Sequence, residues 1–473
     1  MRLPPGPPLP ALAQTVLFLA RPVEFLDACH RRYGDCFTVN TYLIGREIEI
    51  VHPDLVRQVF TGDPDVLRAG EANDILRPLL GARSVLLLDG PEHVRQRKLL
   101  MPPFHGERVM AWARTMQEVA ARAVETWRAG APFALHPHMQ RITLEVILRT
   151  VFGVDEGSQL DDLRDALTRV LDRQSRPIDS LFTLPPLRKS FRGLTPWDGF
   201  LRDRDDADAL IYRQIARRRA ERDRDGAPGT DVLAMLLDAR DEAGEPMTDA
   251  ELRDELVTLL VAGHETTATM LCWAMDFLLG DERELAKVRR ELADARSGGD
   301  LDLATVVKLP YLDAVIKEVL RLRPVVPAVG RRLREPMRLG RYEIPAGELV
   351  VPVSFLTHRL ASVYPEPEAF KPERFVGVKP DPYAWYPFGG GARRCLGMTF
   401  SLHELKVVLA SVLSSARLHK HHPGAAPVKL RGFTLVPTGG VEVVLEARMA
   451  PERTTASGDH RRAAGTPIAQ SRS

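Results

Sequence analysis

A single cysteine within a glycine-rich loop is the residue of this sequence best placed to bind a metal. The loop Phe388–Gly397 reads FGGGARRCLG, and a helical pattern, MTFSLHELKVVLASVL, follows it directly. Glycines let a backbone approach a flat ligand, and a helix N-terminus stabilises a thiolate. No second Cys or His lies nearby to complete a tetrahedral zinc site. The simplest centre with one thiolate is therefore haem iron bound by Cys395, with Arg393 paired to a haem propionate.

A hydroxyl next to a carboxylate, inside an apolar helical run, is the second candidate. The run LVTLLVAGHETTATMLCWAM places Leu259, Ala262, Gly263 and Thr266 at positions i, i+3, i+4 and i+7 of one helix face. Small residues there leave room for dioxygen, and Thr266 beside Glu265 suits ordered proton delivery to it. Taken alone, the motif also fits an ordinary packing face whose threonine bonds to its own helix backbone.

An acidic and a basic residue share one face of a third predicted helix. Glu318 and Arg321 lie at i and i+3, where their side chains can meet. The segment PERF, which contains Arg374, follows further along the chain. Several such pairs are expected by chance in a chain rich in arginine, so the pair by itself is weak evidence of a special role.

Two cations at helical spacing occur in the segment DGPEHVRQRKLLMPPF. His93 and Arg97 are four residues apart, which suits carboxylates lying alongside the helix. Arg331, in PAVGRRL, is a further candidate, with Arg332 directly adjacent to it. Alone, each of these residues is equally typical of surface charge.

The glycine-rich loop resembles the Cys-loop of the cytochrome P-450 superfamily, Phe-x-x-Gly-x-Arg-x-Cys-x-Gly, at all five specified residues. The other motifs follow in the family's order, from about residue 85 to about residue 400. The resemblance implies a mainly α fold with a small β region, in a single triangular haem-binding domain. It also implies haem b, iron protoporphyrin IX, with Cys395 as the axial thiolate.

The resemblance further implies a role for each motif residue. Thr266 and Glu265 are the catalytic pair, and Glu318, Arg321 and Arg374 form a buried structural ion triad. The residues expected to contact the haem are His93, Arg97, Ala262, Gly263, Arg331, Phe388, Arg393, Cys395 and Gly397. Those expected to line the substrate pocket are Leu259, Ala262, Val325, Val326 and Phe433, together with the loops 72–88 and 181–186.

These pocket residues are nearly all apolar, which favours an apolar substrate. The predicted activity is a haem-thiolate monooxygenase that inserts one oxygen atom of dioxygen into a fatty acid, terpenoid, steroid or polyketide-like molecule. A separate ferredoxin and ferredoxin reductase are expected to supply electrons. The alternatives are a peroxide-driven peroxygenase, against which the Glu265–Thr266 pair argues, and a non-enzymatic haem sensor or carrier. Five cationic residues flank the predicted cysteine side: Arg95, Lys98, Arg394, His403 and Lys406. They form either a patch for an acidic protein partner or scattered charge that keeps the protein in solution.

Composition indicates a globular protein of a reducing compartment. The 473 residues are 44% hydrophobic and 27% charged, which excludes a fibrous or wholly disordered chain. A net charge of +2 does not favour a nucleic-acid partner. The four cysteines lack CxxC pairing, and the apolar stretch 8–20 is too short to span a bilayer. We expect a cytoplasmic monomer without a transmembrane anchor.

The apolar periodicity predicts the elements that position these motifs. Residues 1–10 form an extended proline-rich segment, residues 11–447 the haem-thiolate domain, and residues 448–473 a disordered tail. Helices are predicted over Val109–Ala129, Thr143–Phe152, Asp161–Asp172 and Ala207–Asp223, a hairpin over 36–51, and short strands over 342–352 and 428–446.

Overall fold

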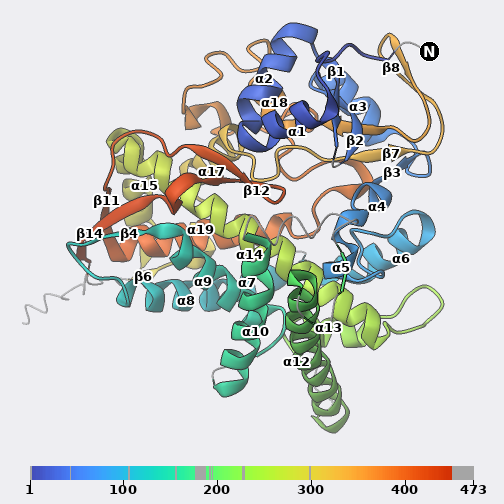
Figure 1. Cartoon of the computed structure of the whole chain (residues 1–473). Helices are drawn as coiled ribbons and strands as arrows, with labels where there is room; N and C mark the ends of the chain where they lie inside the picture. The colour runs from blue at the N-terminus through green and yellow to red at the C-terminus, as the bar shows by residue number, and fades with distance from the viewer. Residues whose placement is uncertain are drawn as a thin grey trace, which may run out of the picture.

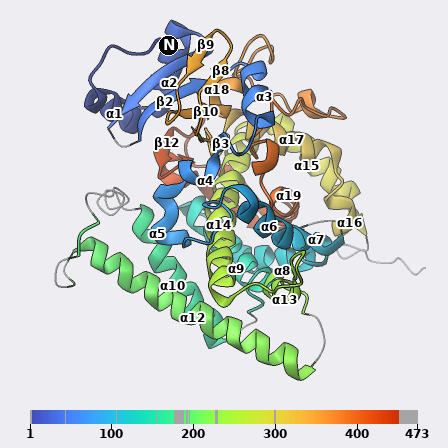
Figure 2. The same ribbon diagram turned by 90° about the vertical axis from the view of Figure 1, so that its right-hand side faces the viewer.

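One long helix organises the fold. The computed structural model describes residues 3–42, 44–104, 107–154, 157–175, 188–190, 193, 195–225, 229–297 and 300–449. Helix α14 (Asp249–Gly280) spans 32 residues and runs through the middle of the molecule in both views (Figure 1, Figure 2). It begins with a capping box, because the Thr248 hydroxyl accepts the Glu251 N–H while the Glu251 carboxylate accepts the Thr248 N–H.

The other helices surround α14, and α9, α17 and α19 pack directly against it. Helix α10 packs on α12 at one edge of the molecule (Figure 2). These helices are α1 (Ala11–Ala20), α2 (Pro22–Tyr33), α3 (Pro53–Thr61), α4 (Ala69–Ala72), α5 (Arg77–Leu80), α6 (Gly90–Leu100), α7 (Glu107–Ala111), α8 (Ala113–Glu125), α9 (Leu135–Thr150), α10 (Ser158–Ser175), α12 (Pro196–Asp225), α13 (Val232–Asp238), α15 (Glu282–Asp294), α16 (Leu303–Val306), α17 (Pro310–Leu322), α18 (Ser354–Thr357) and α19 (Met398–Ser415).

The strands form several small sheets. The largest has the order β1 (Cys36–Thr41), β2 (Gly45–Ile50), β10 (Leu349–Pro352), β7 (Arg331–Leu333) and β3 (Leu67–Arg68), and β10 is parallel to β2 while the other pairs are antiparallel. A three-stranded sheet has the order β11 (Ala416–Lys420), β14 (Glu442–Arg448) and β4 (Pro132–Ala134). Two-stranded pairs are β12 (Val428–Arg431) with β13 (Thr434–Pro437), β5 (Arg296–Ser297) with β6 (Asp300–Leu301), and β8 (Met337–Leu339) with β9 (Tyr342–Ile344).

The prediction of a mainly α fold with a small β region is confirmed, and the predicted hairpin over 36–51 is the β1–β2 pair. Helices α9, α10 and α12 start earlier than their apolar periodicity predicts, α9 and α12 by two turns or more. Helix α9 begins at Leu135 and includes Pro137. The proline is tolerated because it lies in the first turn, where a missing N–H costs no hydrogen bond. Helix α12 begins at Pro196, and its charged first half conceals the helical pattern. The predicted helix 109–129 is divided at Trp112 between α7 and α8.

The proline-rich N-terminal segment packs beside β1. The Pro4 carbonyl accepts the Thr38 hydroxyl at 2.7 Å, and the Pro5 carbonyl accepts the Thr38 N–H at 2.9 Å. Gly6 lies so close to β1 that a Cβ atom there would be 2.0 Å from the Thr38 carbonyl oxygen. Across the described residues, no helix is both long and apolar enough to cross a membrane. Residues 450–473, most of the predicted tail, lie outside the described residues.

Candidate haem and active site

The cysteine loop is closed by its own backbone. The Cys395 N–H donates to the Phe388 carbonyl at 3.0 Å, and a 3-10 turn, η6 (Gly391–Arg393), lies between them. Helix α19 begins three residues after the cysteine, at Met398. The Phe388 ring packs edge-on against Trp385, with 6.4 Å between ring centroids. The loop therefore presents the thiol close to the first N–H groups of α19.

Two of the loop's glycines are required by α3. A Cβ atom on Gly390 would lie 2.2 Å from the Phe60 ring, and one on Gly391 would lie 2.0 Å from the Phe60 carbonyl oxygen. Gly391 also has a φ of +65°, which disfavours other residues. The sequence interpretation assigned the glycines to a flat ligand, whereas these two admit the end of a neighbouring helix.

Cys395 is an exposed residue, unlike the other three cysteines. Protein nevertheless surrounds its sulfur, so burial raises the pKa of the Cys395 thiol. The Gly397 N–H and the positive charges of Arg97 and Arg394 partly oppose that rise in pKa. The thiol consequently keeps its proton near neutral pH until a metal cation replaces it.

Two arginines beside the loop lack a carboxylate partner among the described residues. The Arg97 guanidinium donates to the Arg394 carbonyl at 2.7 Å. Arg331 is 8% exposed and donates only to the Gly330 carbonyl, at 2.8 Å. Burial, followed by the charge of Arg393, lowers the pKa of Arg331 to about 10. A buried guanidinium without a counterion is costly, so this site favours an anion.

The remaining members of the cationic cluster adjoin these arginines. Arg393 forms an ion pair with Asp89 and donates to the Leu88 carbonyl at 2.6 Å. His93 is buried, and burial with the charges of Arg393 and Arg97 lowers its pKa to about 4. Electrostatic interactions link His93 to Arg331 and Asp89 as well. Among the described residues of this cluster, the Asp89 carboxylate is thus set against Arg97, Arg331, Arg393 and His93.

This excess of positive charge matches the two propionates of a haem. The propionates supply the carboxylates that the cluster lacks, and the adjacent Cys395 supplies a thiolate to the iron. The structure also decides between neighbouring arginines. Arg331 belongs to the cluster, whereas Arg332 donates to the Gly347 carbonyl at 2.9 Å. The residues present thus fit the group that the sequence predicts.

Replacing Arg331 with methionine is expected to separate haem retention from protein stability. The variant loses a charged partner for a propionate, so haem transfer to a competing apoprotein should be about 10- to 100-fold faster. The haem-free variant should be at least as stable as the haem-free wild type, because a buried charge has been removed. Stopped-flow haem transfer and urea unfolding measure the two quantities. Arg332→Met is the matched control, and equal haem loss in both variants would contradict the assignment.

One face of α14 is accessible although the helix is otherwise largely buried. The residues of this accessible α14 face are Leu259, Ala262, Gly263 and Thr266. The next residue, Thr267, lies 3.4 Å from Ser401 between hydroxyl oxygens, which places this part of α14 against the first turn of α19. Ser401 is six positions after Cys395 in the chain. The accessible α14 face therefore lies near the cysteine loop.

Ala262, Gly263 and Thr266 on the accessible α14 face each have a different structural environment. The Thr266 hydroxyl donates to the Ala262 carbonyl at 2.5 Å, one turn earlier in the helix. A Cβ atom on Gly263 would lie 3.1 Å from Ile147 of α9, so packing favours glycine there. Of the four residues of this face, Ala262 is exposed and the other three are partly exposed. The face is therefore most open at Ala262, one helical turn before the Thr266 hydroxyl.

The Glu265 carboxylate points toward α9 and β12. It forms an ion pair with Arg431, accepts the Gln140 amide at 2.8 Å and lies 3.4 Å from His136. Burial acts to raise the pKa of Glu265, but the hydrogen bond and charge of His136 and the charge of Arg431 lower it to about 2. Sequence reasoning missed these three partners, because nothing local connects them with Glu265. No hydrogen bond between Glu265 and Thr266 occurs in the described part of the chain.

Glu255, a buried residue of α14, and Arg393 both form hydrogen bonds to the backbone of Val85. The Glu255 carboxylate accepts the Val85 N–H at 2.7 Å, and Arg393 donates to the Val85 carbonyl at 3.2 Å. Burial raises the pKa of Glu255 from 4.5 to about 8. Part of the loop 72–88 is therefore held from two sides.

The raised pKa of Glu255 predicts a pH dependence of stability. Between about pH 4.5 and 8, the folded protein keeps a proton on Glu255 that the unfolded chain releases. The stability that the protonated Glu255 contributes to the fold is therefore fully present below pH 4.5 and is lost as the pH rises through about 8. Glu255→Gln should remove this dependence and raise the free energy of unfolding at pH 9 by about 2–4 kcal/mol. Urea unfolding at pH 6 and pH 9 tests it; an unchanged pH dependence in the variant would refute the protonated state.

The predicted ion triad is assembled. Arg321 donates to both Glu318 carboxylate oxygens, at 2.7 and 2.8 Å, and both side chains are fully buried. The Arg374 guanidinium lies 3.4 Å from the same carboxylate. Arg321 also donates to three carbonyls, those of His358, Pro367 and Ala369. The triad thus connects α17 to the chain that leads into the cysteine loop.

The structure places the other predicted pocket residues on two neighbouring segments. The Leu435 N–H donates to the Val325 carbonyl at 2.8 Å, which joins the β12–β13 hairpin to the segment after α17. Val325 is buried, Val326 is partly exposed, and Phe433 is exposed at the hairpin turn. The predicted lining loop 181–186 lies outside the described residues.

Most of the proposed cationic patch is neutralised by ion pairs. Arg95 lies 2.6 Å from Asp241 and 2.7 Å from Glu251. Lys98 pairs with Glu242 at 2.6 Å, and Lys406 pairs with Asp313 at 2.7 Å. Three of the five predicted cations therefore have carboxylate partners, which the sequence interpretation did not anticipate.

The helical fold, the cysteine loop and the carboxylate-poor cationic cluster together define a haem-thiolate protein. The family model for cytochrome P-450 matches residues 4–442, and the chain belongs to this family. A Mycobacterium tuberculosis protein named cytochrome P-450 135B1 is 43% identical over 473 residues, covering 99% of this chain and 96% of the relative. Another from the same species, named cytochrome P-450 138, is 36% identical and covers 95% of this chain and 97% of the relative.

Solved structures show the same fold. Retinoic acid bound cyanobacterial CYP120A1 has a TM-score of 0.79 and 26% identity, covering 95% of this chain and all of that chain. The cytochrome P-450DA heme domain has a TM-score of 0.82 at 24% identity, covering 96% and 99% of the two chains. Family membership makes this chain a haem-thiolate monooxygenase, an oxidoreductase whose haem is bound through a cysteine thiolate.

Proposed function

We propose that this monooxygenase inserts one oxygen atom of dioxygen into an apolar small molecule of the fatty acid, terpenoid, steroid or polyketide class. The observation that carries the proposal is the accessible α14 face, where Leu259, Ala262 and Gly263 offer apolar surface around one hydroxyl. The partly exposed Val326 and exposed Phe433 add apolar surface from other elements. The retinoic acid bound to a solved relative is likewise largely apolar, which supports this class of substrate.

Haem b, when bound, supplies the activation of dioxygen. The chain's own residues hold the group and control protons around it. When haem is bound, Cys395 would hold the iron through its thiolate, and His93, Arg97, Arg331 and Arg393 would hold the propionates. The Phe388 carbonyl accepts the Cys395 N–H and the Gly397 N–H bonds to the sulfur, so both residues fix the position of the cysteine. The Thr266 hydroxyl, which donates to the Ala262 carbonyl in the structure, would supply a hydrogen bond and a proton on this face of α14 by exchanging that partner.

We assign Glu265 to the proton supply behind Thr266. Its carboxylate is ionised and held by Arg431, His136 and Gln140, so a proton reaches Thr266 only when this ion-pair network opens or exchanges a proton. Arg431 lies in β12, next to the hairpin turn that carries Phe433. Substrate contact at this hairpin would therefore act on the same network.

Replacing Thr266 with alanine is expected to divert electrons from product to hydrogen peroxide. The variant lacks the hydroxyl that delivers the proton, so product per electron consumed should fall about 10- to 100-fold while peroxide release rises. The measurement compares substrate, dioxygen and peroxide in turnover with a ferredoxin and its reductase. Thr267→Ala is the control, because that buried hydroxyl contacts Ser401. Unchanged coupling in Thr266→Ala would reject the proton role.

The same turnover assay distinguishes the competing functions. The proposal requires that apolar substrate accelerates electron uptake from ferredoxin and yields an oxygenated product. Efficient product formation from hydrogen peroxide alone would instead identify a peroxygenase. Haem binding without substrate-linked electron uptake would identify a sensor or carrier.

A further inference from the structure

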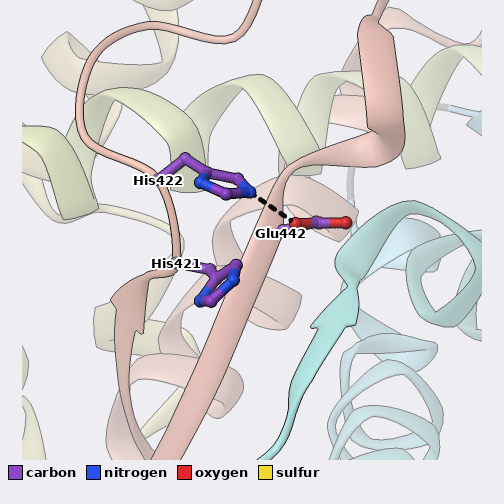
Figure 3. Close-up of side chains that lie close together, drawn as sticks. All are labelled: His421, His422 and Glu442. Atoms are coloured by element: carbon purple, nitrogen blue, oxygen red, sulfur yellow. Dashed lines mark ion pairs between the residues drawn. The ribbon is translucent and has the colours of Figure 1, made fainter.

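Three potential metal ligands meet at one end of the three-stranded sheet, away from the cysteine loop in the sequence. His421 and His422 directly follow β11, and Glu442 begins β14. One ligand atom from each of the three side chains lies within 4.8 Å of the other two. Figure 3 shows both imidazoles beside the Glu442 carboxylate, and His422 Nε2 is 3.0 Å from a Glu442 oxygen.

The backbone fixes the positions of these residues. The His421 N–H donates to the Glu442 carbonyl at 3.0 Å, which extends the β11–β14 ladder beyond the pair Lys420 and Val443. Glu442 is also paired with Ala134 of β4, so the carboxylate projects from the central strand of the sheet. The backbone hydrogen bond between His421 and Glu442 thus holds these two ligands side by side before an ion binds, which lowers the entropy lost on binding.

The surrounding charges are arranged so that they do not compete for the site. The Lys420 ammonium pairs with Asp276 at 2.5 Å and donates to the Gly424 carbonyl, so it is held elsewhere. His419 has its own partner, Glu446, at 2.9 Å. The two imidazole rings of the cluster are 4.4 Å apart between centroids. All three ligand residues are exposed, so an ion can enter without opening the fold.

We propose that His421, His422 and Glu442 bind one divalent transition-metal ion of the Zn²⁺ type. Two imidazoles and one carboxylate form an established donor set for such an ion, with water completing the tetrahedron. The three ligand atoms already lie within 4.8 Å of one another, and the side chains are exposed, so they are free to close around an ion. The ion links the end of β11 to β14 and is separate from the haem site.

The test is Zn²⁺ titration of the haem-loaded enzyme without an affinity tag, followed by calorimetry. Haem loading keeps Cys395 occupied, so its thiolate does not contribute to zinc binding. We expect one equivalent of Zn²⁺ bound at micromolar concentration, and a rise in Tm on adding Zn²⁺. Each of His421→Asn, His422→Asn and Glu442→Gln should weaken binding at least 10-fold and abolish the rise in Tm.

His419→Asn is the matched control, because this histidine lies two residues away in β11 but pairs with Glu446. It should bind zinc as the wild type does. All four positions are exposed, and equal Tm values without metal will show that the variants fold. No binding by the wild type, or unchanged binding by the His421→Asn/His422→Asn double variant, would overturn the proposal. The haem spectrum is read in parallel, so failure of this site leaves the assignment of Cys395 unaffected.

Discussion

Replacing Cys395 with serine is expected to abolish the strongly red-shifted Soret band of the reduced carbon monoxide complex and to reduce turnover by at least about 10³-fold. The band reports a thiolate on haem iron, and a serine hydroxyl does not supply one. No other cysteine is placed to substitute. Burial raises the pKa of Cys29 to about 11 and that of Cys36 to about 12, and it raises the pKa of Cys272 well above its ordinary value.

Cys272→Ala is the control for this experiment. Cys272 is fully buried within α14, so its removal should leave the red-shifted band in place. The haem content of each variant is measured separately, because the cationic cluster can retain haem without the thiolate. A red-shifted band in Cys395→Ser would show that another group ligates the iron and would overturn the site.

Arg321→Met is expected to lower the free energy of unfolding by about 3–5 kcal/mol. The change leaves the fully buried Glu318 carboxylate without its principal counterion. It also removes the donor to the carbonyls of His358, Pro367 and Ala369, which have few alternatives in the interior. Urea unfolding measures the loss, and haem content should fall with it, because this chain segment leads into the cysteine loop.

Lys317→Met provides a control on the same helix. Lys317 pairs with Asp313 at 2.6 Å, but both side chains are partly exposed, so its loss should cost less than about 1 kcal/mol. The double variant Glu318→Leu/Arg321→Met should lose less stability than the two single changes added together, because it removes both fully buried charges at once and leaves only the partly exposed Arg374 without its carboxylate partner. Additive losses would mean that the two residues do not act as a pair.

Local pattern alone predicted the parts of the site whose members are close in sequence. Glu318 and Arg321 meet because helix geometry brings residues three positions apart onto one face. Cys395 precedes α19 because its loop and helix are adjacent in the chain. The face of α14 around Thr266 follows from the same periodicity. In each case, the spacing of the residues along one helix or loop is enough to predict that their side chains lie close together.

Tertiary structure alone decided the contacts between distant segments. Arg431 is 166 residues from Glu265, and only the packing of the β12–β13 hairpin against α14 turns the predicted proton donor into an ion-paired carboxylate. The choice between Arg331 and Arg332 required knowing which side of β7 is buried. The zinc ligands His421 and Glu442 likewise meet only because β11 pairs with β14. Apolar periodicity determines which face of an element is buried, but it does not specify which charged groups from other elements it meets.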